Sequence, residues 1–224
     1  MSKKEDKLEI KKVLYAIRLP VFFVLLMLLV KIVELGFDTT FVTLGVYPRD
    51  ARGIFGVITS PFIHKDWTHL LGNAVPIMAL GSLFVYFNRR NYKEIGLLLF
   101  FISGFWLWIL GRPSYHIGAS GIVYALAAYL VTFGFVIRNP ATLAITFLVI
   151  LFYGSLIWYV LPIKEGMSWE AHLSGALCGV LLAVYYGREY KRRLLSVNGS
   201  INFTYDTKYS DPVKFRYEYK KKED

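Results

Sequence analysis

Long apolar stretches separated by short polar segments dominate this chain. Six of the stretches are long enough to cross a bilayer as a helix, which takes about 20 predominantly apolar residues. They cover residues 17–36, 68–87, 94–110, 120–137, 141–161 and 169–186. The pattern therefore predicts an all-α membrane protein built as a six-transmembrane-helix bundle.

The polar segments divide the chain into three parts. We expect a charged N-terminal segment at residues 1–16, a six-span domain at residues 17–187 and a basic tail at residues 188–224. Alternating apolar residues in the tail, at 201–205 and 213–219, favour a short β-hairpin, and a disordered basic tail beside anionic lipid is the alternative. The connection over residues 37–67 is unusually long and partly apolar, so we expect it at the outer interface.

Composition and charge narrow the classes of protein. Hydrophobic residues make up 55% of the chain and charged residues 19%, against a usual share of about 25% charged, which excludes an ordinary cytosolic enzyme and a disordered chain. One cysteine, Cys178, excludes an intramolecular disulfide. The net charge of +10 sits between and after the apolar stretches, which indicates the lipid bilayer and not nucleic acid as the partner.

The basic residues also predict an orientation. Twenty of the 26 Lys and Arg residues lie on one side of the predicted spans, and basic loops are retained in the cytoplasm. We therefore expect a multi-pass protein of the cell (inner) membrane with both termini cytoplasmic. In that arrangement the second, fourth and sixth spans all run from the outside to the inside.

Polar side chains gather at the outer ends of these three spans. His69 and Asn73 lie in the first turns of the second span, Ser120 opens the fourth, and His172 lies in the first turn of the sixth. Polar residues are costly inside a membrane and usually functional. The shared direction of the spans places all four at a similar shallow depth.

The residue types indicate nucleophilic chemistry. A serine hydroxyl needs a neighbouring base, and His172 is the candidate base for Ser120. Gly118 and Gly121 flank Ser120, and Gly175 and Gly179 form a GxxxG face that lets membrane helices pack closely, which would bring the two side chains together. Glu170 points to another face of the helix, so we expect a Ser–His pair without an acid.

Other side chains around the pair have candidate roles. His69 and Asn73 share one helix face and, with the Ser120 backbone N–H, could surround an oxyanion. Tyr124 lies one turn below Ser120, where its ring could stack on His172. The simpler alternatives are that Ser120 eases helix packing, that His172 is a buried histidine bonded to a carbonyl, that His69 and Asn73 tie down the long loop, and that Tyr124 is ordinary packing.

Two histidines remain outside this scheme. His116 has no assigned role and is expected in a hydrated loop. A metal site formed by His64, His69 and His116 is conceivable but lacks carboxylate partners. We therefore expect neither a metal nor a cofactor.

Together these motifs resemble the rhomboid intramembrane serine proteases. The resemblance rests on Gly-Ala-Ser-Gly at 118–121, Ala-His-Leu-Ser-Gly at 171–175 followed by Gly179, and His64 and His69 with Asn73, and it covers about residues 14–190. It implies a rhomboid-like bundle with Ser120 as nucleophile, His172 as general base, and an oxyanion hole formed by His69, Asn73 and the Ser120 backbone. It also implies that Tyr124 supports His172 and that His64 is structural.

The resemblance further implies an endopeptidase that cuts a transmembrane segment of another membrane protein near the outer face. Two other classes stay open at this point. One is a catalytically inactive rhomboid-like protein that binds membrane helices without cutting them. The other is a transporter, which predicts broken helices and internal repeats that the sequence does not display.

Overall fold

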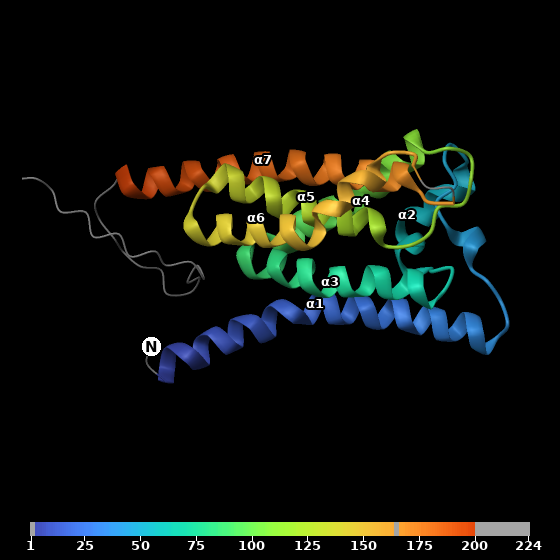
Figure 1. The fold of residues 1–224 in the computed structure, drawn as a ribbon, viewed down its shortest axis with the longest axis horizontal. Coiled ribbons are helices and arrows are strands. Elements are labelled where there is room, and N and C mark those ends of the chain that lie inside the picture. The colour runs from blue at the N-terminus through green and yellow to red at the C-terminus, as the bar shows by residue number, and fades with distance from the viewer. Residues whose placement is uncertain (1–2, 164–165, 200–224) are drawn as a thin grey trace, which may run out of the picture.

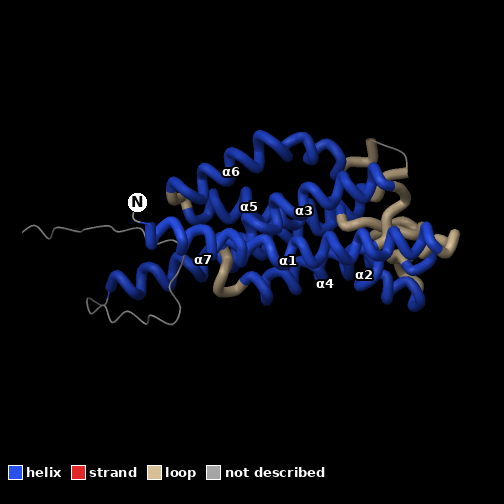
Figure 2. The backbone as a smooth tube through the Cα atoms, turned by 90° about the horizontal axis from the view of Figure 1, so that it is seen from below, coloured by secondary structure: helices blue, strands red, loops and turns tan. Residues whose placement is uncertain are grey.

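The computed structural model describes residues 3–163 and 166–199, and over this part of the chain it is a bundle of six long helices (Figures 1 and 2). These are α1 (Lys3–Gly36), α3 (Trp67–Phe87), α4 (Tyr92–Leu110), α5 (Ser120–Ile137), α6 (Pro140–Tyr153) and α7 (Trp169–Gly199). Five of the six contain a whole predicted span and α6 contains most of the fifth, so the all-α bundle expected from the apolar pattern is confirmed.

Hydropathy alone finds five of these helices. Within the described residues, the helices long and apolar enough to cross a membrane are Asp6–Gly36, Trp67–Phe87, Tyr92–Leu110, Ser120–Ile137 and Pro140–Val160. The sixth helix, α7, has 31 residues but carries Glu170, His172 and Ser174 in its first turns and a basic stretch at its other end. These polar residues lower its hydropathy, although its middle section is as apolar as the other spans.

α5 lies at the centre of the bundle. It packs against α3, α4, α6 and α7, whereas α1 packs mainly against α3. A central helix needs apolar or small residues on every face, and α5 buries nine of its 18 residues, including Val123, Tyr129 and Phe133. The residue that opens this helix is therefore held from several sides.

The outer surface of the bundle is apolar. Leu25 and Leu29 on α1, Val75 on α3, Phe147 on α6 and Leu181 on α7 all have more than half of their side-chain surface exposed. A soluble protein would bury such residues or cover them with a partner. Their distribution around the bundle indicates that lipid, not water, surrounds it.

Two helices run beyond the predicted spans. α1 begins at Lys3, well before residue 17, and α7 continues past residue 186 to Gly199. The hydrocarbon core limits only how many apolar residues a helix needs, so a charged helix end can continue into the head-group region. The predicted tail hairpin at residues 201–219 lies outside the described residues.

The predicted fifth span is not a continuous α-helix. α6 ends at Tyr153, and the chain continues as the 3-10 helix η4 (Gly154–Val160), where an α-helix over residues 141–161 was expected. Hydropathy does not distinguish the two helix types, because a 3-10 turn of the same residues is equally apolar. This change of helix type positions two backbone carbonyls of the site described below.

The long connection between α1 and α3 is ordered. It contains η1 (Val42–Leu44), η2 (Ala51–Phe55), α2 (Gly56–Thr59) and η3 (Ser60–Phe62), all at the end of the bundle where α3, α5 and α7 begin (Figure 1). α2 packs on α4, and the Trp108 indole donates to the Asp50 carbonyl at 3.0 Å. The buried Lys31 of α1 pairs with Glu34 at 3.2 Å and also donates to the carbonyls of His64 and Lys65.

Both ends of the described chain lie at the other end of the bundle. Figure 1 shows the start of α1 and the end of α7 on the same side, opposite the long connection. An even number of crossings requires this arrangement. The starts of α3, α5 and α7 consequently meet at one level, as the direction of the spans predicts.

Candidate active site

A tight turn brings Ser120 to the start of α5. Gly118 has a φ of +99°, a backbone conformation that side chains rarely adopt. A Cβ at this position would also lie 2.6 Å from His69 Nε2, so a glycine is needed for space as well as for conformation. The Gly118 N–H donates to the Ser60 carbonyl at 2.8 Å, which ties the turn to the long connection.

Glycines hold α5 and α7 in close contact. A Cβ built on Gly175 would collide with the carbonyl oxygen of Gly121, and one on Gly179 would collide with the carbonyl oxygen of Ala125. One on Gly121 would already lie 3.2 Å from the Ala171 carbonyl oxygen. The helix backbones therefore touch directly, as the GxxxG pattern predicts.

This contact brings the predicted pair together. His172 Nε2 lies 2.9 Å from Ser120 Oγ, within hydrogen-bond distance. The other ring nitrogen, Nδ1, lies 2.8 Å from the Tyr159 carbonyl oxygen of η4. Because a carbonyl only accepts, Nδ1 carries the proton in the neutral ring, and Nε2 is left to accept from the serine hydroxyl.

Among the described residues, no carboxylate is hydrogen-bonded to His172. Glu170 is buried and pairs with Arg112, in the loop before α5, at 3.3 Å. The backbone carbonyl of Tyr159 occupies the place that an acid takes in a catalytic triad. No sequence pattern could reveal this acceptor, because any residue supplies a carbonyl and only the 3-10 geometry of η4 orients this one.

Tyr124 lies against the histidine ring. The two ring centroids are 4.1 Å apart and the planes differ by 5°, so the rings are stacked. The Tyr124 hydroxyl donates to the Leu156 carbonyl at 2.9 Å. Two carbonyls of η4 thus hold His172 and its stacking partner, and the predicted ring contact is present.

His69 and Asn73 lie beside the Gly118 turn. Asn73 is buried and its amide donates to the His69 carbonyl at 2.9 Å. Asp66 caps α3 by accepting from the His69 backbone N–H at 2.8 Å. The His69 ring is close to Gly118, and Asn73 Nδ2 would be 3.6 Å from a Cβ there. Both side chains therefore face the segment that leads into Ser120.

His64 is packed behind His69 and is fully buried. The two rings meet edge to face with centroids 5.0 Å apart, and Nδ1 lies 3.3 Å from the Phe62 carbonyl. Burial lowers the pKa of His64 to about 4, so the ring is neutral at physiological pH. A neutral imidazole behind His69 fits a structural position in the loop.

His116 occupies a position that the sequence left without a role. Its Nδ1 lies 2.6 Å from Ser168 Oγ, and its Nε2 lies 3.0 Å from the Arg112 carbonyl. Its backbone forms an antiparallel bridge with Val46. Burial lowers the pKa of His116. The buried ring links the loop that leads into Ser120 with the residue just before α7, where a hydrated loop histidine was expected.

The family comparison agrees with this geometry. The rhomboid domain model matches residues 51–189, which contain Ser120, His172, His69 and Asn73. The chain belongs to the rhomboid family. This rhomboid protein is thus an integral membrane protein, and the match begins in the long connection, after α1.

Curated relatives of this rhomboid protein come from mycobacteria. An uncharacterized protein of Mycobacterium tuberculosis is 30% identical over 188 residues, which is 80% of this chain and 78% of the relative. An uncharacterized protein of Mycobacterium leprae is 29% identical over 157 residues, covering 66% of this chain and 62% of the relative. These relatives establish the kinship and carry no activity in their names.

Proposed function

We propose that this rhomboid protein is an intramembrane serine endopeptidase that uses Ser120 and His172 to cut transmembrane segments of other membrane proteins. The observation that carries the proposal is the 2.9 Å contact between His172 Nε2 and Ser120 Oγ, together with the Tyr159 carbonyl that orients the ring. A serine that only eased helix packing would not need a histidine held in the tautomer that accepts its proton.

The first half of the reaction forms an acyl-enzyme. Ser120 Oγ attacks the substrate carbonyl carbon while His172 Nε2 takes the hydroxyl proton, which produces a tetrahedral oxyanion. The imidazolium then donates that proton to the leaving amine, and the C–N bond breaks. The Tyr159 carbonyl and the stacked face of Tyr124 stabilise the positive charge on the ring between these two steps.

The second half releases the acyl group. Water gives a proton to His172 as it attacks the ester, and the ring returns the proton to Ser120. In both halves the oxyanion is bound by the Ser120 backbone N–H, His69 and Asn73. Loss of one such donor typically costs about 2.7–4 kcal/mol of transition-state stabilisation.

The substrate class follows from the position of the pair. Ser120 is the first residue of α5 and His172 lies in the first turn of α7, at one end of the bundle, so a bond near one surface of the membrane is the one within reach. An α-helix shields its peptide bonds from attack, so the substrate segment has to unwind locally. α6 lies at an edge of the bundle in Figure 2 and buries only Thr142, Thr146 and Val149, which makes it the side from which a lipid-embedded segment can approach.

We also propose that both ends of the chain lie in the cytoplasm. With the start of α1 and the basic end of α7 in the cytoplasm, the pair lies near the outer face of the cell membrane. The catalytic domain then covers residues 17–187, flanked by the charged segments 1–16 and 188–224.

The experiment is active-site labelling of the full chain in liposomes with a fluorophosphonate probe, combined with cleavage of a transmembrane reporter. We expect the label on Ser120, none on Ser120→Ala and little on His172→Ala. Ser103→Ala is the matched control, because it removes a buried serine hydroxyl from α4 that bonds only to its own helix.

Two outcomes would contradict the proposal. Full labelling of His172→Ala would contradict the assigned base. A folded wild-type protein that neither takes the label nor cuts would support the alternative of an inactive rhomboid-like protein that binds membrane helices.

A further inference from the structure

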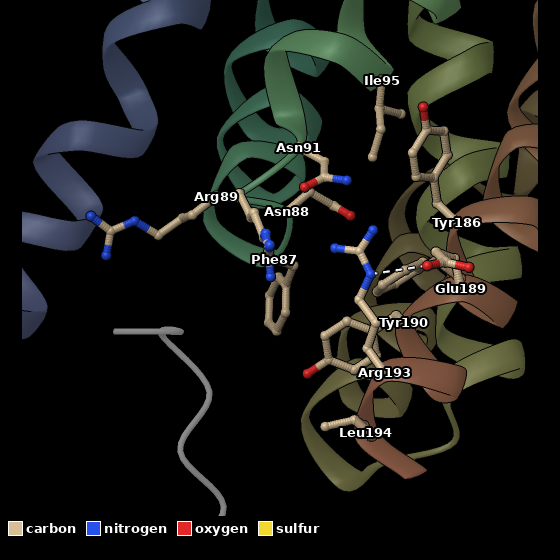
Figure 3. Close-up of a pocket in the computed structure, with 12 residues that line it drawn as sticks. Phe87, Asn88, Arg89, Asn91, Ile95, Tyr186, Glu189, Tyr190, Arg193 and Leu194 are labelled. Atoms are coloured by element: carbon tan, nitrogen blue, oxygen red, sulfur yellow. Dashed lines mark hydrogen bonds and ion pairs between the residues drawn. The ribbon is translucent and has the colours of Figure 1, made fainter. Parts of the chain in front are cut away.

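A second polar recess lies at the end of the bundle opposite Ser120. It is a cavity of about 190 Å³ between the turn at residues 87–91, the start of α4, and residues 186–194 of α7 (Figure 3). It shares no residue with the site around His172. The proposed function does not use it.

Arginines dominate the charge of this recess. Arg89, Arg90 and Arg193 line it, and Glu189 is the acidic residue among the residues that line it. Figure 3 shows the Arg193 side chain pointing from α7 into the space below Asn91. Three arginines against one glutamate give the residues that line the recess a net positive charge. Glu189 pairs with Arg193 at 3.0 Å and with Arg192 at 3.2 Å.

Neutral groups on the opposite wall favour an anion as well. Asn91 is the N-cap of α4 and lines the recess. Its side chain makes no capping hydrogen bond to the first turn of α4. The positive end of the α4 dipole points the same way. Asn88 is a fixed part of the wall, because it donates to the Phe84 carbonyl and accepts from the Tyr129 hydroxyl.

The recess lies at the depth of lipid head groups. α7 has 31 residues and is therefore about 46 Å long, whereas the hydrocarbon core is about 30 Å thick. A helix that begins near one surface at Trp169 leaves the hydrocarbon after about 20 residues, close to Arg188. Tyr186 and Tyr190 line the recess at this boundary, where aromatic residues are enriched.

The turn that forms one wall is held in place by α1. The Arg89 guanidinium lies 5.2 Å from the centre of the Tyr15 ring, and the Tyr15 and Tyr92 hydroxyls are 2.8 Å apart. Tyr86 donates to Glu9 at 2.9 Å. The recess is therefore built from ordered elements and does not depend on a loose loop.

We propose that this recess binds the phosphate head group of an anionic phospholipid. Arg90 and Arg193 would bind the phosphate oxygens, since each guanidinium offers five N–H donors and can serve an ion pair and a phosphate together. The apolar walls at Phe87, Phe133 and Leu194 suit the glycerol and upper acyl carbons, which favours a lipid over free phosphate. A bound head group would connect the α3–α4 turn with α7 and stabilise the fold.

The test is lipid binding by the purified full chain in neutral detergent, followed by native mass spectrometry and by thermal unfolding. The probes are dioctanoyl phosphatidylglycerol, dioctanoyl phosphatidylcholine and inorganic phosphate at equal ionic strength. We expect phosphatidylglycerol to bind at least tenfold more tightly than the other two and to raise Tm. The variant Arg90→Gln/Arg193→Gln should lose about tenfold or more of this affinity.

The matched control is Lys93→Gln/Arg188→Gln. It removes the same charge from the same two parts of the chain, at exposed positions outside the recess. It should change the affinity by less than threefold. Equal losses in both variants would mean diffuse attraction and would overturn the proposal, as would phosphate binding as tightly as the lipid or no preference over phosphatidylcholine.

Crosslinking keeps the test independent of variant folding. A photoactivatable phosphatidylglycerol should label residues 87–91 and 186–194 of the wild-type protein, and the matching phosphatidylcholine should label them much less. Labelling spread evenly over the helices would also overturn the proposal.

Discussion

Replacing Gly175 by alanine should separate Ser120 from His172. A Cβ at position 175 would lie 2.9 Å from the Gly121 carbonyl carbon and 3.2 Å from its Cα, and closer still to the oxygen. Non-bonded heavy atoms pack at about 3.5 Å, and the clash with the carbonyl oxygen is the shortest of the three, so the helices must move apart by roughly 1 Å or more. The Ser120–His172 distance of 2.9 Å would then leave the hydrogen-bond range.

The expected consequence is a loss of turnover. A displacement of about 1 Å at reacting groups can cost about 100-fold in rate, so kcat should fall by about two orders of magnitude while KM changes little. Overpacking should also lower the free energy of unfolding by about 1–3 kcal/mol. Both are measured on protein in liposomes, by cleavage of a fluorogenic transmembrane reporter and by thermal unfolding.

Gly96→Ala is the control for this substitution. It makes the same chemical change on α4, where a Cβ would meet Phe84 at an ordinary 3.7 Å. Its kcat should equal that of the wild type. If Gly175→Ala folds and keeps wild-type kcat, the contact between α5 and α7 does not set the catalytic distance, and the reasoning is refuted.

Three further predictions concern single side chains. Asn73→Ala should lower kcat by about 100- to 1,000-fold in the reporter assay if its amide binds the oxyanion, and an unchanged kcat would assign it to the loop alone. Tyr124→Phe keeps the stacked ring and should retain most activity, whereas Tyr124→Ala should lose about tenfold, and equal losses in both would place the effect in the hydroxyl. Because burial lowers the pKa of His64 to about 4 from an unfolded value near 6.5, the unfolded state binds the proton first as pH falls. Stability should therefore drop by about 2 kcal/mol between pH 7 and pH 5, and Tm of His64→Gln should depend less on pH; an identical pH dependence would contradict the assignment.

The sequence alone determined the number and order of the long helices and the meeting place of the site. Apolar runs of bilayer length dictate helices in lipid, because backbone polar groups must be satisfied within each segment. The direction of the spans then places His69, Asn73, Ser120 and His172 at one level. The glycines at 175 and 179 predicted the close contact of α5 and α7, since only small residues let membrane helices touch.

The tertiary structure decided the groups that orient the pair. The acceptor for His172 is the backbone carbonyl of Tyr159, and a carbonyl has no residue type that a sequence pattern can reveal. It points to the ring only because the helix tightens to 3-10 geometry after Tyr153. The bond between His116 and Ser168 likewise joins two loops 52 residues apart, and their contact depends on how α5 and α7 pack.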